Sequence, residues 1–378
     1  MRLDAFTERV MRKNKSNQSR LPLTISAQYG LVDQITFFNK VVASTDLSNY
    51  YLLKKGEFAY NKSYSSDYPW GAIKRLDNYD QGALSSLYIC FAPQDNVVSD
   101  FILQYFESPK WHKGISEIAV EGARNHGLLN VAVQDFFHTY HYVPKDKKEQ
   151  IKISKLLMLL DERIATQSKI IDKLQSLIKG INQNVFTDDG FNYMLKELCE
   201  IRSGYSGNQL TSKNGLKVSR IETISGHKVN IERVGYVAPF ASSENYKLQI
   251  GDILFSNINS VEYIGNTAFI EKDYGLYHGM NLLRLMPNKN IVIPLYLYLL
   301  LNTNKMQNHF KTICNKAVSQ ASINQTELGK TVVKIPSIKA QKQICELYQS
   351  LYNKLETENN AISLLQKQKE YLLRQMFI

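Results

Sequence analysis

Residues able to do chemistry occur along the whole chain, but none of them completes a familiar catalytic motif. Leu328-Gly329-Lys330-Thr331 resembles the end of a phosphate-binding loop, yet the first glycine of that motif falls on Asn324. Without this glycine the loop cannot turn tightly around phosphates, so we interpret the segment as a turn that leads into a strand. The G-x-G-x-x-G sequence of dinucleotide sites is also missing. We therefore expect a chain that is not an enzyme by itself.

Two histidines have a spacing that suggests a metal site. His138 and His141 lie three residues apart in the stretch 137–143, which alternates like a strand. Residues i and i+3 of a strand point to opposite faces, so no shared metal is expected and both side chains are predicted to be partly exposed. The cysteines form no C-x-x-C pair, which argues against a zinc ribbon or a disulfide scaffold and favours a reduced, cytosolic chain. They are Cys90, Cys199, Cys314 and Cys345.

Polar loops recur in the two halves of the chain and carry side chains that match DNA. Tyr60–Ser66 and Phe255–Ser260 each follow a glycine, an acid and an apolar strand, while Gly122–Gly127 and Val318–Asn324 each precede the last strand of their half. Arginine can bond guanine, and asparagine or glutamine can bond adenine. We expect Arg124 to contact a base. The alternatives are ordinary turn chemistry for the loops and an ion pair of Arg124 with a nearby acid such as Glu121.

A basic segment near the start of the chain offers phosphate contacts. It holds Arg9, Arg12, Lys13, Lys15 and Arg20 with no acid among them. Such a segment can neutralise several phosphates and release their counterions, although a solvated loop would have the same composition. The predicted DNA-binding residues of the whole chain are Arg9, Arg12, Lys13, Lys15, Lys62, Tyr64, Arg124, Asn125, His126, Arg202, Asn257, Asn259, Ser260, Ser319 and Gln320.

The elements that position these residues are predicted to occur twice. Leu3–Arg9 resembles Leu195–Ile201, which lies 192 positions later, and Lys55–Asn61 resembles Ile250–Ser256, which lies 195 positions later. Prolines end matching apolar strands at positions 93 and 287, and again at 144 and 336. Loop insertions would produce the small drift between these spacings. Such recurrence in the same order indicates an internal repeat.

Each repeat is predicted to close with a long helix. Apolar residues recur in alternating steps of four and three from 153 to 185 and from 344 to 376, and the two series superimpose at a constant spacing of 191. This seven-residue period is typical of helices that pack knobs into holes, and about 40 helical residues span roughly 60 Å. We expect the two helices to pair antiparallel, with a polar layer that fixes their alignment; the alternative is two amphipathic helices, each packed on its own domain. The predicted contact residues are Leu157, Leu160, Ile164, Gln167, Ile171 and Leu174, with Leu351, Leu355, Glu358, Ile362 and Leu365.

The predicted fold class is α+β, because short strands bounded by Gly, Asn and Ser alternate with helical stretches such as 99–108 and 294–311. We expect a first recognition domain over residues 1–146 and a first long helix over 147–186. A second recognition domain over 187–337 and a second long helix over 338–378 would follow. Two similar domains related by a pseudo-two-fold axis suit a ligand that is itself bipartite.

Composition limits the partners that we expect. Hydrophobic residues make up 44% of the 378-residue chain and charged residues 21%, which is typical of a globular protein. The net charge of +11 favours an acidic partner. The first residues carry acids where a signal peptide needs an apolar stretch, and the longest apolar run, 291–301, contains a proline and is too short to span a bilayer. We therefore expect a cytoplasmic chain with no membrane contact.

Several stretches of the chain are typical of one protein family. They are Leu248–Ser256, which reads Leu-Gln-Ile-Gly-Asp-Ile-Leu-Phe-Ser, the Ile-Pro-x-x-x-x-Gln-Lys-Gln-Ile sequence at 335–344, the similar sequence at 143–151 and the matched helix ends Leu174–Phe186 and Leu365–Phe377. On these stretches the chain resembles the specificity subunits of type I restriction–modification systems over essentially its whole length. In this family two target-recognition domains alternate with two long helices.

The resemblance implies a non-catalytic chain whose two domains each read one half of a split site in double-stranded DNA. It also implies that the helix pair sets the spacing and docks two methyltransferase subunits, and that restriction and translocase subunits join the complex. S-adenosylmethionine, ATP and Mg²⁺ are then expected on those partners, with no cofactor or metal on this chain. The competing hypothesis is a coiled-coil scaffold or dimerisation protein without sequence-specific DNA binding.

Overall fold

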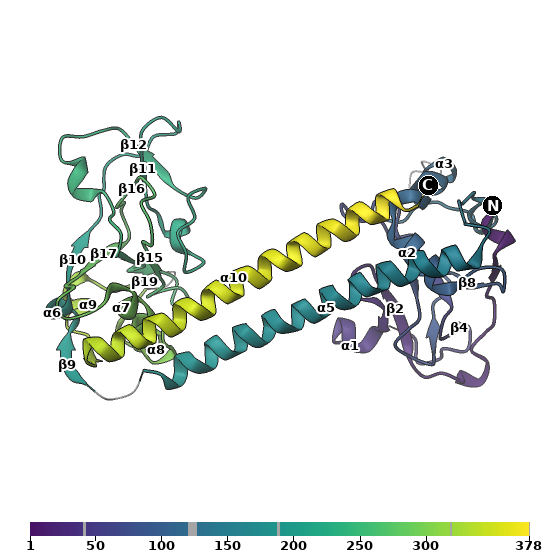
Figure 1. Ribbon diagram of the computed structural model, residues 1–378, viewed down its shortest axis with the longest axis horizontal. Coiled ribbons are helices and arrows are strands. Elements are labelled where there is room, and N and C mark those ends of the chain that lie inside the picture. Colours follow the sequence, from purple (N-terminus) through teal and green to yellow (C-terminus); the bar gives the residue numbers. More distant parts are fainter. Residues whose placement is uncertain (41–42, 120–126, 187–189, 318–319, 378) are drawn as a thin grey trace. The chain divides into compact units, whose positions relative to one another are not determined.

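The computed structural model describes residues 1–40, 43–119, 127–186, 190–317 and 320–377 (Figure 1). The chain divides into two compact units. Unit 1 is Met1–Lys169 with Asn359–Ile378, and unit 2 is Ile170–Glu358. Both units mix helices and sheets, so the α+β prediction is confirmed at this level. In the ranges just given, no helix is long and apolar enough to cross a membrane.

Unit 1 contains two four-stranded sheets among its described residues, with the strand orders β1-β8-β5-β6 and β3-β2-β7-β4. The strands are β1 (Thr7–Arg9), β2 (Pro22–Ser26), β3 (Gly30–Asp33), β4 (Tyr51–Lys54), β5 (Phe58–Asn61), β6 (Ala72–Arg75), β7 (Gln81–Leu84) and β8 (Ile89–Pro93). The helices are α1 (Gln34–Phe38), α2 (Ser99–Glu107), α3 (His112–Ile118) and α4 (Val133–His138), and α5 (Lys147–Asn184) begins here. Short 3₁₀ segments lie at Leu3–Ala5, Lys15–Asn17 and Pro109–Trp111.

Unit 2 contains sheets with the orders β10-β17-β13-β15, β12-β11-β16, β14-β19-β18 and β20-β9. The strands are β9 (Phe191–Met194), β10 (Cys199–Ser203), β11 (Leu216–Val218), β12 (Gly235–Val237), β13 (Ile253–Phe255), β14 (Ile258–Asn259), β15 (Thr267–Phe269), β16 (Leu276–Tyr277), β17 (Leu283–Pro287), β18 (Asn315–Lys316), β19 (Ala321–Ser322) and β20 (Val332–Ile335). The helices are α6 (Leu195–Leu198), α7 (Pro294–Leu301), α8 (Asn304–Ile313) and α9 (Gln325–Gly329), and α10 (Ile338–Gln375) begins here. Ile221–Ile224 and Ser243–Tyr246 are 3₁₀ segments.

One sheet of each unit has the same design. The two sheets are β1-β8-β5-β6 in unit 1 and β10-β17-β13-β15 in unit 2, and both are antiparallel. In each sheet the strand in second place leads into a helix: β8 is followed by α2, and β17 is followed by α7. A glycine with positive φ precedes the third strand in both sheets, at Gly56 (87°) and Gly251 (98°). L-residues rarely adopt this backbone conformation, which explains the glycine of the predicted turn.

A glutamine anchors the first turns of each long helix to its unit. The buried Gln150 of α5 accepts a hydrogen bond from the Val98 N–H at 2.7 Å and donates one to the Pro144 carbonyl at 2.7 Å. Gln341 of α10 has the equivalent partners, the Ile293 N–H at 2.8 Å and the Pro336 carbonyl at 2.9 Å. Both glutamines therefore satisfy buried backbone groups that the helices alone would leave unpaired.

The long helices α5 and α10 each have 38 residues, about 57 Å. Every predicted contact position on them is buried or half-buried. Leu157, Leu160, Ile171, Glu358 and Leu365 are buried, whereas Ile164, Gln167, Leu174, Leu351, Leu355 and Ile362 are half-buried. The apolar period thus identifies the covered face of each helix.

Two details of the predicted elements are wrong. The helical stretch at 294–311 is two helices, because the Thr303 side chain accepts the Met306 N–H and starts a new helix at α8. The stretch 137–143 is not a strand: α4 ends at His138, and Phe136 and Phe137 both enter the core of unit 1. The start of the predicted strand, Phe137 and His138, is therefore the last turn of a helix.

Candidate nucleic-acid interface

In unit 1 the structure brings the two predicted loops together. Ser63 and Leu128 form an antiparallel bridge. The Tyr64 N–H donates to the Gly127 carbonyl at 3.0 Å, and the Leu129 N–H donates to the Lys62 carbonyl at 2.9 Å. The Tyr64 side chain is 48% exposed at this edge. The backbone pairing therefore holds one loop against the end of the other, while Arg124, Asn125 and His126 lie outside the described residues.

Unit 2 pairs its two predicted loops in the same way. β14 and β19 are antiparallel neighbours, with Ile258 opposite Ser322, and β19 also pairs with β18. The Ile323 N–H donates to the Asn257 carbonyl at 2.9 Å and extends the contact. Gln320 is exposed beside this small sheet, whereas Ser319 lies outside the described residues. Each unit thus presents one surface made of two polar loops, which we call its reading surface.

The asparagines of the unit 2 reading surface differ in their hydrogen bonds. Asn259 donates to the Ser256 hydroxyl at 3.1 Å and accepts the Ser260 N–H at 2.8 Å, so its amide already supports the loop. The buried Oδ1 of Asn257 has no hydrogen-bond partner among the described residues. A buried acceptor without a partner costs roughly 1–3 kcal/mol, which a donor from a ligand would offset. Of the two asparagines, Asn257 is therefore the one whose amide oxygen the loop itself leaves without a donor.

The basic segment divides into paired and unpaired cations. Arg12 donates to both carboxylate oxygens of Glu57 at 2.8 Å, and Lys13 donates to the Asn49 carbonyl at 2.7 Å with its ammonium 4.4 Å from the centre of the Tyr51 ring. These two side chains support the fold of unit 1. The exposed Arg9, Lys15 and Arg20 have no ion-pair partner within the described part of the chain, so they are the cations available for phosphates. In unit 2, half of the Arg202 side chain is exposed, and its Nε lies 2.6 Å from a carboxylate oxygen of Glu200.

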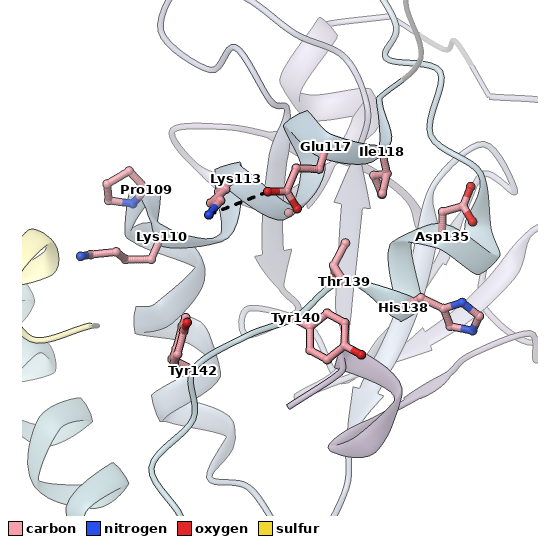
Figure 2. A pocket seen from close by; sticks show the side chains of 11 residues that line it. Pro109, Lys110, Lys113, Glu117, Ile118, Asp135, His138, Thr139, Tyr140 and Tyr142 are labelled. Atoms are coloured by element: carbon pink, nitrogen blue, oxygen red, sulfur yellow. Dashed lines mark ion pairs between the residues drawn. The ribbon is translucent and has the colours of Figure 1, made fainter.

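Sequence reasoning did not find a cavity of about 560 Å³ in unit 1. Figure 2 shows its two walls: Lys110, Lys113 and Glu117 on one side, and the segment from Asp135 to Tyr142 on the other. Lys113 and Glu117 form an ion pair at 3.9 Å. The side chains of Tyr140 and Tyr142 are 76% and 69% exposed at the rim. Tyrosine is enriched in protein interfaces, so these exposed side chains favour a binding role for the cavity.

His141 is buried behind this cavity, in contrast to the partly exposed side chain that we predicted. Its ring nitrogens lie 3.1 Å from the Tyr105 hydroxyl and 2.8 Å from the Thr139 hydroxyl. Burial lowers the pKa of His141 to about 4, so the ring is neutral near pH 7. The ring supports the core of unit 1. In the described ranges, His, Cys, Asp and Glu form no group of three or more that is placed to hold a metal.

Comparison with known proteins adds to this geometry. Residues 190–367 match the family model described as the type I restriction modification DNA specificity domain. The second half of the chain is therefore similar to this DNA specificity domain. This match covers the unit 2 reading surface and most of α10.

Relatives of this family extend the similarity to both halves of the chain. A Methanocaldococcus jannaschii protein named for the type I restriction enzyme MjaX specificity subunit is 44% identical over 187 residues, which are 48% of this chain and 44% of that protein. The EcoKI specificity subunit of Escherichia coli is 22% identical over 312 residues, 75% of this chain and 66% of that protein. The chain thus spans less than two thirds of each relative. The crystal structure of the type I S subunit from M. genitalium has the same fold, with a TM-score of 0.57 and 16% identity over 100% of this chain and 95% of that one.

Proposed function

We propose that this chain is the DNA-specificity subunit of a type I restriction–modification complex. Each unit would read one half of a bipartite target in double-stranded DNA through its reading surface. The observation that carries this proposal is that both units pair two polar loops beside sheets of the same strand order. Two related readers with different side chains suit two different half-sites. The chain would supply recognition and no catalysis.

We further propose that the chain is an internal repeat and that α5 and α10 pair as an antiparallel coiled coil. Each unit contains a segment of both helices. In unit 1, Asp161 of α5 pairs with Lys369 of α10; in unit 2, Ile178 of α5 and Tyr348 of α10 share one apolar cluster. The residue numbers rise along α5 as they fall along α10, which supports the antiparallel arrangement. Such a pair would set the spacing between half-sites.

Two methyltransferase subunits would dock beside the helices, with restriction and translocase subunits joining through them. These partners would bind S-adenosylmethionine, ATP and Mg²⁺. Apolar side chains on the outer face of α5 support a docking role, since Leu156, Leu159 and Leu177 are 44%, 53% and 50% exposed. Exposed leucines in a row along a helix favour contact with another protein.

Methylation mapping tests this function. DNA from cells that express the methyltransferase subunits with this chain should carry methylation at a bipartite motif with a fixed spacer. Cells without the chain should lack that methylation. Replacing residues 1–146 with the matching domain of another specificity subunit should change one half of the motif only. A methylation pattern that is the same with and without the chain would support the scaffold hypothesis instead.

A further inference from the structure

A polar pocket of about 340 Å³ lies in unit 2, where β13 begins beside β17, the strand that pairs with β10 on its other side. Its lining is rich in charge and contains two more cations than carboxylates. The charged residues are Arg202, Glu244, Lys247, Asp252, Arg284 and Lys289. Like-charged groups repel one another unless a counter-charge is present, so this composition favours a bound anion.

A buried ion pair forms part of the pocket wall. Arg284 of β17 and Asp252 lie 2.6 Å apart, and their side chains are 6% and 7% exposed. Asp252 also accepts the Gln249 N–H at 2.7 Å across the turn that contains Gly251. Burial raises the pKa of Asp252, while Arg284 and Lys289 act in the opposite direction. This pair is used by the fold, and it makes the turn a rigid support for the neighbouring side chains.

Two lysines of the pocket remain available to a ligand, since Arg202 already pairs with Glu200. Among the described residues, Lys247 and Lys289 have no ion-pair partner, and Lys247 is half-buried. The Nε of Arg284 has no hydrogen-bond partner there either, although it is fully buried. Lysine binds phosphate as a point charge, and two lysines beside a buried arginine can hold one phosphate group.

We propose that this pocket holds a phosphate of the DNA backbone next to the half-site that unit 2 reads, an inference that rests on the proposed function. β13 separates the pocket from the reading loop that begins after Phe255. Its three residues span about 10 Å, close to the ~12 Å width of the major groove. A loop that enters the groove therefore places the pocket near a backbone that borders the groove.

Unit 1 lacks these cations at the matching positions. Arg284 lies opposite Leu254 in the unit 2 sheet. At the equivalent pair of the unit 1 sheet, Cys90 lies opposite Ala59, so a cysteine replaces the arginine. Glu57, in the place of Asp252, binds Arg12 instead. Two residues after the proline that ends the strand, unit 1 has Asp95 where unit 2 has Lys289. The proposed phosphate contact is therefore confined to one half of the target.

The test is DNA binding by the full chain carrying K247Q and K289Q, measured by anisotropy of a labelled duplex with the mapped target over a range of salt concentrations. We expect the slope of log affinity against log salt to fall by about 1 for each lysine, with an unchanged base preference. The matched control is K339Q with K342Q on α10, which removes the same charge and should leave the slope unchanged. Unfolding curves of both double variants verify the fold.

Methylphosphonate substitution identifies the phosphate. Neutralising backbone positions one at a time should reveal one position beside the unit 2 half-site that weakens wild-type binding and has no further effect on K247Q/K289Q. If the pocket takes free phosphate alone, no such position will be found, and the proposal is overturned. Equal salt slopes for K247Q/K289Q and K339Q/K342Q would overturn it as well. If wild-type chain does not prefer its mapped target at all, the proposed function itself is wrong.

Discussion

The two units hold their segments of α5 and α10 with different chemistry at matching positions. In unit 1, Gln104 of α2 donates to Asp161 of α5 at 3.0 Å, and Asp161 pairs with Lys369 of α10. In unit 2, Leu299 of α7 and Ile178 of α5 occupy the positions that match Gln104 and Lys369, and they join one buried apolar cluster. The same architecture therefore tolerates a polar or an apolar junction.

The apolar junction of unit 2 and the polar junction of unit 1 differ in how much they stabilise the fold and in how selective they are for their partner side chains. Apolar burial is strong but non-directional, so the unit 2 junction accepts any side chain of suitable shape. The unit 1 junction requires a cation opposite an acid, and it is partly solvated because Asp161 is 39% and Lys369 20% exposed. We infer that the unit 1 junction contributes less free energy but distinguishes the end of α10 from other helix ends.

The largest expected effect is on the apolar junction. Leu299→Ala should lower the free energy of unfolding of unit 2 by about 2–5 kcal/mol, because it removes a buried leucine and leaves a cavity. Hydrogen exchange of α7 amides measures this loss. Gln104→Ala at the matching position of unit 1 is the control and should cost less. If Leu299→Ala and Gln104→Ala lower the free energy of unfolding equally, the apolar junction is not the stronger of the two.

The second effect compares the two reading surfaces. Arg124→Ala should cost about 1–3 kcal/mol of DNA affinity and relax selectivity at one position of the half-site that unit 1 reads, while the other half stays unchanged. Lys62→Ala should weaken binding evenly and reduce the salt slope by about 1. Selection from randomised duplexes measures both. Unaltered affinity and preference in Arg124→Ala would remove this loop from the reading surface.

A smaller effect comes from pH. Since burial lowers the pKa of His141 from 6.5 to about 4, the unfolded chain takes up a proton first as the pH falls. The stability that neutral His141 provides is complete above its unfolded pKa and should decrease by about 1 kcal/mol between about pH 7 and about pH 5.5. His141→Val, which copies Val333 at the matching position of unit 2, should reduce this dependence in unit 1; the part that remains comes from His112, whose pKa burial also lowers.

Hydrogen exchange of unit 1 amides at the two pH values measures the effect of His141. Unit 2 contains a comparable group, since burial lowers the pKa of His278 to about 4. The pH dependence of unit 2 should therefore be the same in His141→Val and in the wild type. Loss of the dependence in both units would show that the two histidines are coupled.

The smallest expected effect is on the polar junction. Lys369→Met should destabilise unit 1 by less than about 1 kcal/mol, because water and salt screen a partly exposed ion pair. The loss should diminish in high salt, and Lys367→Met, on the exposed face of the same helix, should have no effect. A loss as large as that of Leu299→Ala would show that the ion pair is a main source of stability.

Local patterns predicted the long helices and their covered faces. Leu157, Ile171 and Leu365 were placed from their seven-residue period alone, and all three are buried. Helical periodicity needs only near neighbours in the sequence, so it can be seen without knowledge of the fold. The glycines at 56 and 251 were found for a similar reason, because the turns there require a positive φ that glycine tolerates.

Side chains whose role depends on distant partners could not be predicted in this way. The sequence around Arg284 shows a cation in an apolar strand, but its partner Asp252 lies 32 positions earlier. His141 depends on Tyr105, 36 positions away, and was misplaced because its own neighbours alternate like a strand. The pairing of the reading loops is equally non-local, since Ser63 meets Leu128.

The sequence by itself determined the mixed helix and sheet class, the covered faces of the two long helices and the polar loops that recur. These features follow from spacing and from local backbone chemistry. Only the tertiary structure decided which loops meet, which cations the fold already uses and which remain for a ligand. The physical reason is that hydrogen bonds and ion pairs act over a few ångströms between residues that the sequence separates widely, so the folded chain alone brings them together.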